Sequence, residues 1–323
     1  RSPSRGLGDV YKRQVSMVNK RVDTGPLLDP LPKTLLMSIN QILLALIVPI
    51  TWGFGYTLTK IGMDQFTPLL LMSFRFGIAG LILIWFTKPP WEHMRELFKI
   101  AFIGSTVQYG LTYYGLKGID VSTASILLQL EGPILALLST LILKERLGWP
   151  RALGMGLAFA GVFVIAGEPR LNDSLDSVAL VISGCVFWAI AQIMISRLKS
   201  LSGITILAWV AIIATPQMLL ISLVIEDGQW ESIKSASLVD WSIVFYLSFI
   251  MTVIGYSVWY HLLRICDVSR ISPFLMLLPV TSIIGGMMLL EERFTLAMGI
   301  GGLLVMTGVA STLIKWREPT KQL

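Results

Sequence analysis

The sequence predicts an all-α polytopic membrane protein with ten transmembrane helices, and three observations lead to this fold class. Hydrophobic residues make up 54% of the chain and charged residues only 14%, and the mean hydropathy is +0.72. Soluble domains carry roughly 25% charged residues, so this chain has too little charge to cover a water-facing surface. The apolar residues also come in blocks of about 20, the length that crosses a bilayer as a helix. The joins between them are short and polar, such as "KERLGWPR" and "EPRLNDSLD".

The predicted helices follow one another closely and leave no room for a soluble domain. Strands of a transmembrane β-barrel would alternate apolar and polar residues over about ten positions, and these blocks do not. The expected helices are residues 40–59, 67–87, 98–116, 121–143, 150–167, 177–196, 203–225, 240–263, 268–290 and 295–314.

Basic residues are distributed unevenly between the loops on the two sides of the membrane. If the N-terminus is cytoplasmic, sixteen Lys and Arg residues of positions 17–323 fall on the inside of the membrane. Only five fall outside: Lys60, Lys117, Arg170, Lys234 and Arg293. The positive-inside rule therefore places both termini in the cytoplasm. The net charge of +6 reflects this bias, and we expect no nucleic-acid partner.

The two ends of the chain are expected to lie outside the membrane. Residues 1–16 open with "RSPSRGLGDVYKRQ", which is polar, arginine-rich and lacks the apolar core of a signal peptide. We interpret them as a non-native leader before a start near Met17. Residues 17–38 are then a cytoplasmic N-terminal segment, and residues 316–323 are a cytoplasmic tail.

The chain contains one sequence pattern twice. The stretch "YGLTYYGLKGIDVSTASILLQLEGPILALLSTLILKERLGWPRALGMGLAFAGV" starts at Tyr109, and it aligns without a gap with "YSVWYHLLRICDVSRISPFLMLLPVTSIIGGMMLLEERFTLAMGIGGLLVMTGV", which starts at Tyr256. The shift is 147 residues (256 − 109). "DVS" at 120–122 and 267–269 and "ER" at 145–146 and 292–293 recur at this same shift. Matches between Leu or Gly residues are common by chance in membrane helices. Matches of "DVS" and "ER" at one constant shift are not, so we interpret the repeat as real.

The repeat predicts a mechanism as well as a fold. Each copy holds five helices, an odd number, so the second copy enters the membrane the other way up. Inverted repeats are a recurrent architecture of secondary transporters, whose substrate site lies at the repeat interface near mid-membrane. We therefore expect a first repeat over 39–168, with helices 1–5, and a second over 176–315, with helices 6–10.

The sequence resembles a known family. "WGFGYTLTKIG", "FRFGIAGLIL" and "LQLEGPILALLSTLILKERLGWPRALGMGLAFAGVFVIAG" are similar to the EamA family of the drug/metabolite transporter superfamily, over essentially the whole chain after about residue 38. Within it, the chain looks most similar to bacterial exporters of amino acids and small metabolites, of the O-acetylserine/cysteine exporter type. The resemblance implies export of small metabolites across the inner membrane. It does not identify the substrate, since related proteins move aromatic amino acids, drugs or nucleotide sugars.

A carboxylate and a helix break are predicted near the middle of helix 4. Glu131 lies about ten residues into this helix, roughly 15 Å from its start at 1.5 Å per residue, and charges at that depth are costly. Gly132 and Pro133 follow it, and Pro279 interrupts helix 9 at a corresponding depth. Interrupted helices in corresponding positions of two repeats indicate a transporter binding site. We predict a hinge at these three residues.

Arg75 is the candidate partner of Glu131, because helix 2 carries it to a similar depth. One interpretation is a structural ion pair that joins helices 2 and 4. In the other, Arg75 holds a substrate carboxylate while Glu131 binds an ammonium group or carries a proton. A third alternative has the two residues facing apart, each in its own polar pocket.

Aromatic and amide side chains at membrane depth are the other candidates for lining the substrate site. Trp52 and Trp188 stand out because they align with each other between the repeats. The remaining candidates are Tyr56, Gln108, Tyr109, Gln129, Gln192, Tyr256 and Tyr260. His261 is expected to be interfacial, and Cys185 and Cys266 to be packing residues without metal-ligand spacing.

Other classes of membrane protein have little support. The chain has two histidines, no "HExxH", no paired aspartates inside helices and no Walker sequence, so we expect neither an enzyme nor an ATP-driven pump. Nothing resembles a channel filter. We predict a secondary transporter that exports small metabolites, such as amino acids or their derivatives, by alternating access. It would need no cofactor or metal and could couple to protons, as a monomer or homodimer. A multidrug efflux carrier of the same fold is the alternative.

Overall fold

The structure is a computed structural model, and it describes residues 37–143, 149–168, 171, 174–266 and 268–313. The chain divides into two compact units, Arg1–Ser38 and Ile39–Leu323. The helices described below belong to the second unit. The expected leader and cytoplasmic tail, and most of the N-terminal segment, lie outside the described residues.

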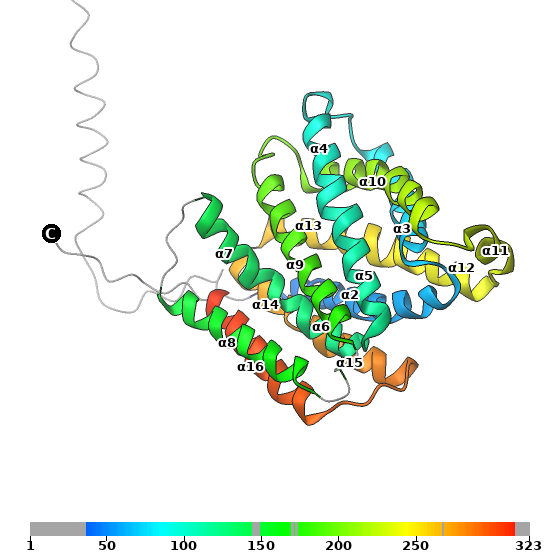
Figure 1. Cartoon of the computed structure of the whole chain (residues 1–323). Helices are drawn as coiled ribbons and strands as arrows, with labels where there is room; N and C mark the ends of the chain where they lie inside the picture. The colour runs from blue at the N-terminus through cyan, green and yellow to red at the C-terminus, as the bar shows by residue number, and fades with distance from the viewer. Residues whose placement is uncertain (1–36, 144–148, 169–170, 172–173, 267, 314–323) are drawn as a thin grey trace, which may run out of the picture. The chain divides into compact units, whose positions relative to one another are not determined.

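These residues form helices and no strand (Figure 1). The α-helices are α2 (Ile39–Gln65), α3 (Pro68–Leu83), α4 (Met94–Ala101), α5 (Gln108–Gly118), α6 (Val121–Leu127), α7 (Glu131–Leu143), α8 (Trp149–Ala166), α9 (Leu175–Ile195), α10 (Gly203–Ile225), α11 (Gln229–Ser235), α12 (Leu238–Phe245), α13 (Gly255–Ile265), α14 (Val268–Leu275), α15 (Leu278–Leu289) and α16 (Leu296–Leu313). Short 3₁₀ turns, η1 (Ile84–Phe86) and η2 (Trp91–His93), lie between α3 and α4.

Six helical stretches are long and apolar enough to cross a membrane: Ile39–Gln65, Pro68–Phe86, Val121–Ile142, Leu175–Ile195, Gly203–Ile225 and Leu238–Ile265. Shorter apolar helices cover Ala152–Ala166, Pro273–Leu289 and Leu296–Ser311. The predicted class, an all-helical membrane protein, is therefore confirmed. Ten crossings, their division into two inverted sets of five and the cytoplasmic termini stay predictions.

Helices of the first predicted repeat pack against helices of the second. The main pairs are α8 with α16, α3 with α10, α5 with α9, and α2 with α15. A continuous core of buried Leu, Ile, Val, Met and Phe side chains runs through both predicted repeats. The interface between the repeats is thus part of the core of the protein.

The contact between α8 and α16 is made at glycines. A Cβ atom added at Gly161 would lie 2.5 Å from the carbonyl oxygen of Gly301, and one at Gly308 would lie 2.5 Å from that of Gly154. Only glycine allows such an approach of two helix backbones. Both helices are rich in glycine, and they pack against each other within the chain.

Two helices are interrupted at corresponding places. A 3₁₀ turn, η4 (Leu128–Leu130), separates α6 from α7, and residues 276–277 form a turn between α14 and α15. The helices after the breaks start at Glu131 and Leu278, which are 147 residues apart, the shift of the sequence repeat. Pro133 and Pro279 lie in the first turns of these following helices, and both are buried.

Two π-helical segments also occupy corresponding places. η3 (Phe102–Val107) leads into α5, and η6 (Tyr246–Ile254) leads into α13. Shifted by 147, the first segment falls on residues 249–254, inside the second. Single π-helical turns within α-helices are frequently found at functional sites, because the wider turn leaves backbone groups open to other partners.

Candidate functional site

Arg75 in α3 is a buried cation between the two predicted repeats. Its side chain is 2% exposed. Its Nε donates to Thr252 Oγ1 at 2.9 Å and its Nη1 donates to Tyr113 Oη at 3.0 Å. The guanidinium carbon lies 5.4 Å from the ring centroids of both Phe76 and Tyr109. Every partner in these contacts is uncharged, so the charge of Arg75 is not neutralised by them.

Glu131 begins α7, directly after the helix break, and its side chain is partly exposed. Within the described parts of the chain it forms no ion pair with Arg75. Tyr56, Tyr109 and Tyr256 lie close enough to both Glu131 and Arg75 to interact electrostatically with each of them. The acid and the base therefore face one aromatic cluster without touching each other.

This aromatic cluster has two arms. In one, the rings of Tyr56 and Tyr109 contact Tyr113, with centroids 6.4 and 5.6 Å apart. In the other, Tyr256 contacts Trp52 at 4.8 Å and Tyr260 at 6.2 Å. Six aromatic side chains from three helical segments thus form this cluster, and Tyr109 and Tyr113 contact Arg75 directly.

The π-helical segment η6 contributes two contacts to this site. The indole nitrogen of Trp52 donates to the carbonyl oxygen of Met251 in η6 at 3.1 Å. Thr252, the next residue, donates its hydroxyl to Leu247, five residues earlier, at 2.8 Å and accepts from Arg75. The segment η6 therefore holds both a candidate aromatic residue and the buried cation.

The remaining predicted site residues are Gln108, Gln129, Trp188 and Gln192. Gln108 is buried and bonds within its own helix to Thr112 at 3.2 Å, and its Oε1 has no partner among the described residues. Trp188 and Gln192 lie three and seven residues after Cys185 on α9, and therefore on one helix face. The Cys185 thiol contacts the carbonyl of Leu127, next to the helix break, at 3.8 Å. This face of α9 is turned toward the break and Gln129.

Sequence reasoning missed two residues of this site. Tyr113 was visible in the repeat, since the pair Tyr109 and Tyr113 aligns with Tyr256 and Tyr260, and a spacing of four places each pair on one helix face. Thr252 had no signal in the sequence, because a π-helical turn follows from tertiary packing and not from a residue pattern.

The predicted hinge residue Gly132 is exposed, and a Cβ atom there would meet nothing within 4 Å.

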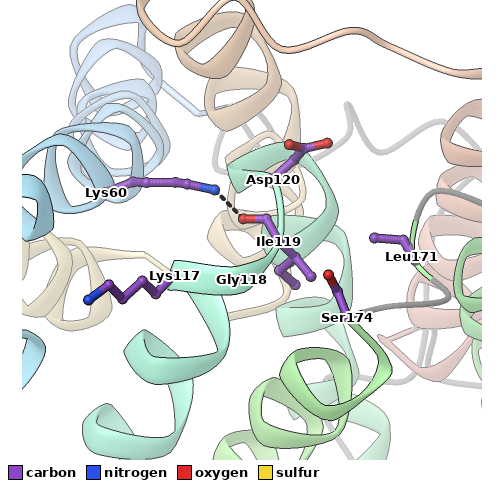
Figure 2. A pocket seen from close by; sticks show the side chains of 7 residues that line it. All are labelled: Lys60, Lys117, Gly118, Ile119, Asp120, Leu171 and Ser174. Carbon is purple, nitrogen blue, oxygen red and sulfur yellow. Dashed lines mark hydrogen bonds between the residues drawn. The ribbon is translucent and has the colours of Figure 1, made fainter.

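A group of polar contacts gathers at one end of the helices, where α2, α5, α10 and α15 end and α3 and α6 begin. Figure 2 shows a polar cavity of about 200 Å³ there, lined by Lys60, Lys117, Gly118, Ile119, Asp120, Leu171 and Ser174. Lys60 donates to the carbonyl of Ile119, whereas the Lys117 side chain points away from the cavity's other polar groups. The segment between α5 and α6 is thereby attached to α2.

Glu226, just after α10, is a second anchor at this end. Its carboxylate accepts from Thr67 Oγ1 at 2.6 Å, from the Leu69 N–H at 2.9 Å and from Tyr114 Oη at 2.7 Å. Burial opposes ionisation of this carboxyl, but the hydrogen bonds it accepts outweigh burial and hold its pKa below the ordinary value. Glu226 is therefore an ionised group that joins α10 to α3 and α5.

The fold and the site together define a polytopic helical membrane protein with two interrupted helices and a buried cation between the two predicted repeats. The EamA-like transporter family matches residues 39–167 and 176–314. This chain belongs to the EamA-like transporter family. The family and its relatives indicate a transporter and not an enzyme.

Several relatives align over nearly their whole length. The chain is 28% identical to a probable amino-acid metabolite efflux pump of Escherichia coli (strain K12), over 88% of this chain and 99% of the relative. A probable amino-acid metabolite efflux pump of Salmonella typhimurium is 27% identical over 87% and 97%. An uncharacterized transporter of Archaeoglobus fulgidus is 29% identical over 83% and 96%. A solved crystal structure shares the fold, with a TM-score of 0.60 at 17% identity, over 85% of this chain and 96% of that one. The chain is thus a multi-pass membrane transporter with a small-molecule substrate.

Proposed function

We propose that this transporter exports amino acids or amino-acid derivatives across the bacterial inner membrane, with both termini in the cytoplasm. The buried, uncompensated charge of Arg75 carries this proposal. A buried charge is costly unless it is paired, so an arginine whose observed partners are neutral is suited to an anionic ligand. The guanidinium Nη2 has no hydrogen bond to a described residue and can donate to a carboxylate.

The acid near the aromatic cluster supports a zwitterionic substrate. Glu131 would accept the substrate ammonium group, and Tyr56, Tyr109 and Tyr256 lie near both charges. Aromatic faces also attract ammonium groups. Because Arg75 and Glu131 do not pair with each other, each remains available to one end of such a substrate.

Export would proceed by alternating access of the two repeats. The breaks before Glu131 and Leu278 would supply the bending points, in the region of Gly132, Pro133 and Pro279. Proton coupling through Glu131 is part of the proposal, because a carboxyl group at membrane depth can exchange a proton as the site changes sides. Transport could be carried out by one chain or by a homodimer.

Efflux measured from proteoliposomes tests this function. The vesicles are loaded with a panel of radiolabelled amino acids and their derivatives, with a lipophilic cation added as the representative of multidrug export. The protein should export amino acids with a free carboxylate. Arg75→Gln should abolish this export, Arg75→Lys should restore part of it, and Glu131→Gln should lose the pH dependence. Export of the lipophilic cation that survives Arg75→Gln, without amino-acid export, would instead establish the multidrug carrier. Unchanged amino-acid export in all three variants would refute the proposed site.

A further inference from the structure

Two carboxylates of the second repeat hold one end of the protein together. Glu292, between α15 and α16, accepts hydrogen bonds from the Val121 and Ser122 N–H groups at 2.6 and 3.0 Å and from Ser122 Oγ at 2.6 Å. Glu226 accepts from Thr67, Leu69 and Tyr114, as described above. All six donors belong to the first predicted repeat. Both acids thus fasten the second repeat to the first at the same end of the helices.

The contact of Glu292 joins two short motifs that recur in the sequence. Glu292 belongs to the second "ER" pair, and Val121 and Ser122 belong to the first "DVS" triplet. The motif of one repeat is therefore the partner of the other motif in the opposite repeat. The counterpart glutamate, Glu145, lies outside the described residues.

The two interrupted helices contact each other at one end, although α15 packs chiefly on α2. At the end that carries these carboxylates, α6 packs against α15. Beyond the breaks, α7 packs chiefly on α9, and α14 packs chiefly on α2. Figure 1 shows α6 and α15 together while α7 leads away from them. The two broken helices therefore meet at the fastened end and take separate partners beyond it.

We infer that Glu226 and Glu292 are the latches of a gate, which close this end of the transporter and must release for the site to open there. This inference rests on the alternating-access function proposed above. Each latch consists of charge-assisted hydrogen bonds, about twice as strong as neutral ones, and yet each carboxylate can be hydrated when the end opens. Such contacts suit a closure that forms and breaks in every cycle. By the positive-inside orientation, this end faces out of the cell.

A permanent helix cap and a gate latch predict different responses. If Glu292 only caps α6, its loss disturbs the amides it contacts and nothing else. If it is a latch, its loss shifts the population toward the state that is open at this end. The distant Glu226 contacts would then loosen as well, and the opposite end would gain protection.

Hydrogen–deuterium exchange of the full-length protein, in nanodiscs and without substrate, separates these cases. Glu292→Gln removes the charge of one latch, and Glu226→Gln removes that of the other. Their neighbours provide matched controls, since Glu291 and Asp227 are exposed acids for which Glu291→Gln and Asp227→Asn change the same charge. Ser122→Ala is a milder variant, which removes one of three donors and leaves the carboxylate in place.

We expect Glu292→Gln to speed exchange roughly tenfold at the start of α6 and also at the start of α3, which Glu292 does not touch. Exchange in α7 and α14 should slow. Glu226→Gln should give the same pattern, Ser122→Ala a weaker one, and the two controls none. Faster exchange confined to the amides around residue 121 would overturn the gate. So would faster exchange in all helices of Glu292→Gln combined with no change in Ser122→Ala. The exchange experiment contains no substrate, so it tests the gate alone. A negative result would overturn the gate but not the proposed function, which the efflux experiment tests separately.

Discussion

The side chain of Arg75 reaches across the interface of the two repeats and donates from Nε to the hydroxyl of Thr252, 2.9 Å away. That hydroxyl gives its own proton to the carbonyl of Leu247, so its lone pairs face the guanidinium. A buried cation of the first repeat is thereby oriented by a π-helical segment of the second. Any ligand that moves Arg75 also acts on η6.

Removing the Thr252 hydroxyl should destabilise the folded protein. Thr252→Val keeps the shape of the side chain but leaves the Nε donor of a buried charge unsatisfied, which costs about 1–3 kcal/mol. We expect a lower midpoint of thermal unfolding in detergent, and a midpoint near the original for Thr252→Ser. Thr215→Val is the control, because the Thr215 hydroxyl bonds only within its helix, to Ala211 at 2.8 Å. Equal midpoints for Thr252→Val and Thr215→Val would contradict this role.

Glycines in α8 should differ sharply in their tolerance of a methyl group. In Gly161→Ala the new Cβ atom would meet the Gly301 carbonyl oxygen at 2.5 Å, so the helices must separate, at a cost of about 1–3 kcal/mol. Gly156 has nothing within 4 Å of an added Cβ atom, and Gly156→Ala should be neutral or slightly stabilising, because alanine favours helix. Chemical denaturation of both variants in mixed micelles decides the matter. A Gly161→Ala variant as stable as Gly156→Ala would show that α8 and α16 are not held this closely.

Acid should weaken the contacts of Glu226. Because its pKa in the folded protein lies below that of an unfolded glutamate, about 4.3, the carboxylate contributes its full stabilisation above that unfolded value. The contribution is lost as pH falls through the lower, folded pKa. The difference in unfolding midpoint between wild type and Glu226→Gln, followed from pH 7 to pH 3, should therefore shrink toward zero. A difference that stays constant over this range would show that ionised Glu226 contributes nothing.

The two lysines of the polar cavity should behave differently. Lys60→Met deletes the donor to the Ile119 carbonyl, and we expect a loss of about 1–2 kcal/mol. Lys117 is exposed and its side chain points away from the cavity's other polar groups, so Lys117→Met should have little effect. Thermal unfolding of the two variants side by side gives the comparison. A larger loss of stability for Lys117→Met than for Lys60→Met would show that Lys117, and not Lys60, stabilises this end of the protein.

Much of the helical framework could be predicted, because membrane crossing leaves a strong mark on composition. Blocks of apolar residues, short polar joins and a constant shift of 147 between two motifs indicated the helices and the internal repeat. The prolines indicated the interruptions, and the structure places the breaks just before the helices that begin at Glu131 and Leu278.

The details of the site were harder to predict, for physical reasons. Arg75 and Glu131 were expected at similar depths, which was enough to suggest partners but not to decide whether they touch. That depends on how tyrosines from separate helices fill the space between them. Thr252 lies in a π-helical segment without a sequence signature. Glu226 and Glu292 resembled ordinary loop acids, since their hydrogen-bond donors lie more than 110 residues away in the chain.

The glycine pairs of α8 and α16 bear on the ancestry of the chain. Gly154 and Gly161 correspond to Gly301 and Gly308 under the repeat shift of 147. The observed contacts are Gly154 with Gly308 and Gly161 with Gly301, so each contact pairs the two different positions of the motif. A two-fold axis generates this exchange. A five-helix protein with one such pair of glycines could have formed both contacts by dimerising with an inverted copy of itself. Duplication and fusion of its gene would then have joined the two copies in one chain. After fusion, each half was free to acquire a residue that the other lacks, as Glu131 stands opposite Leu278.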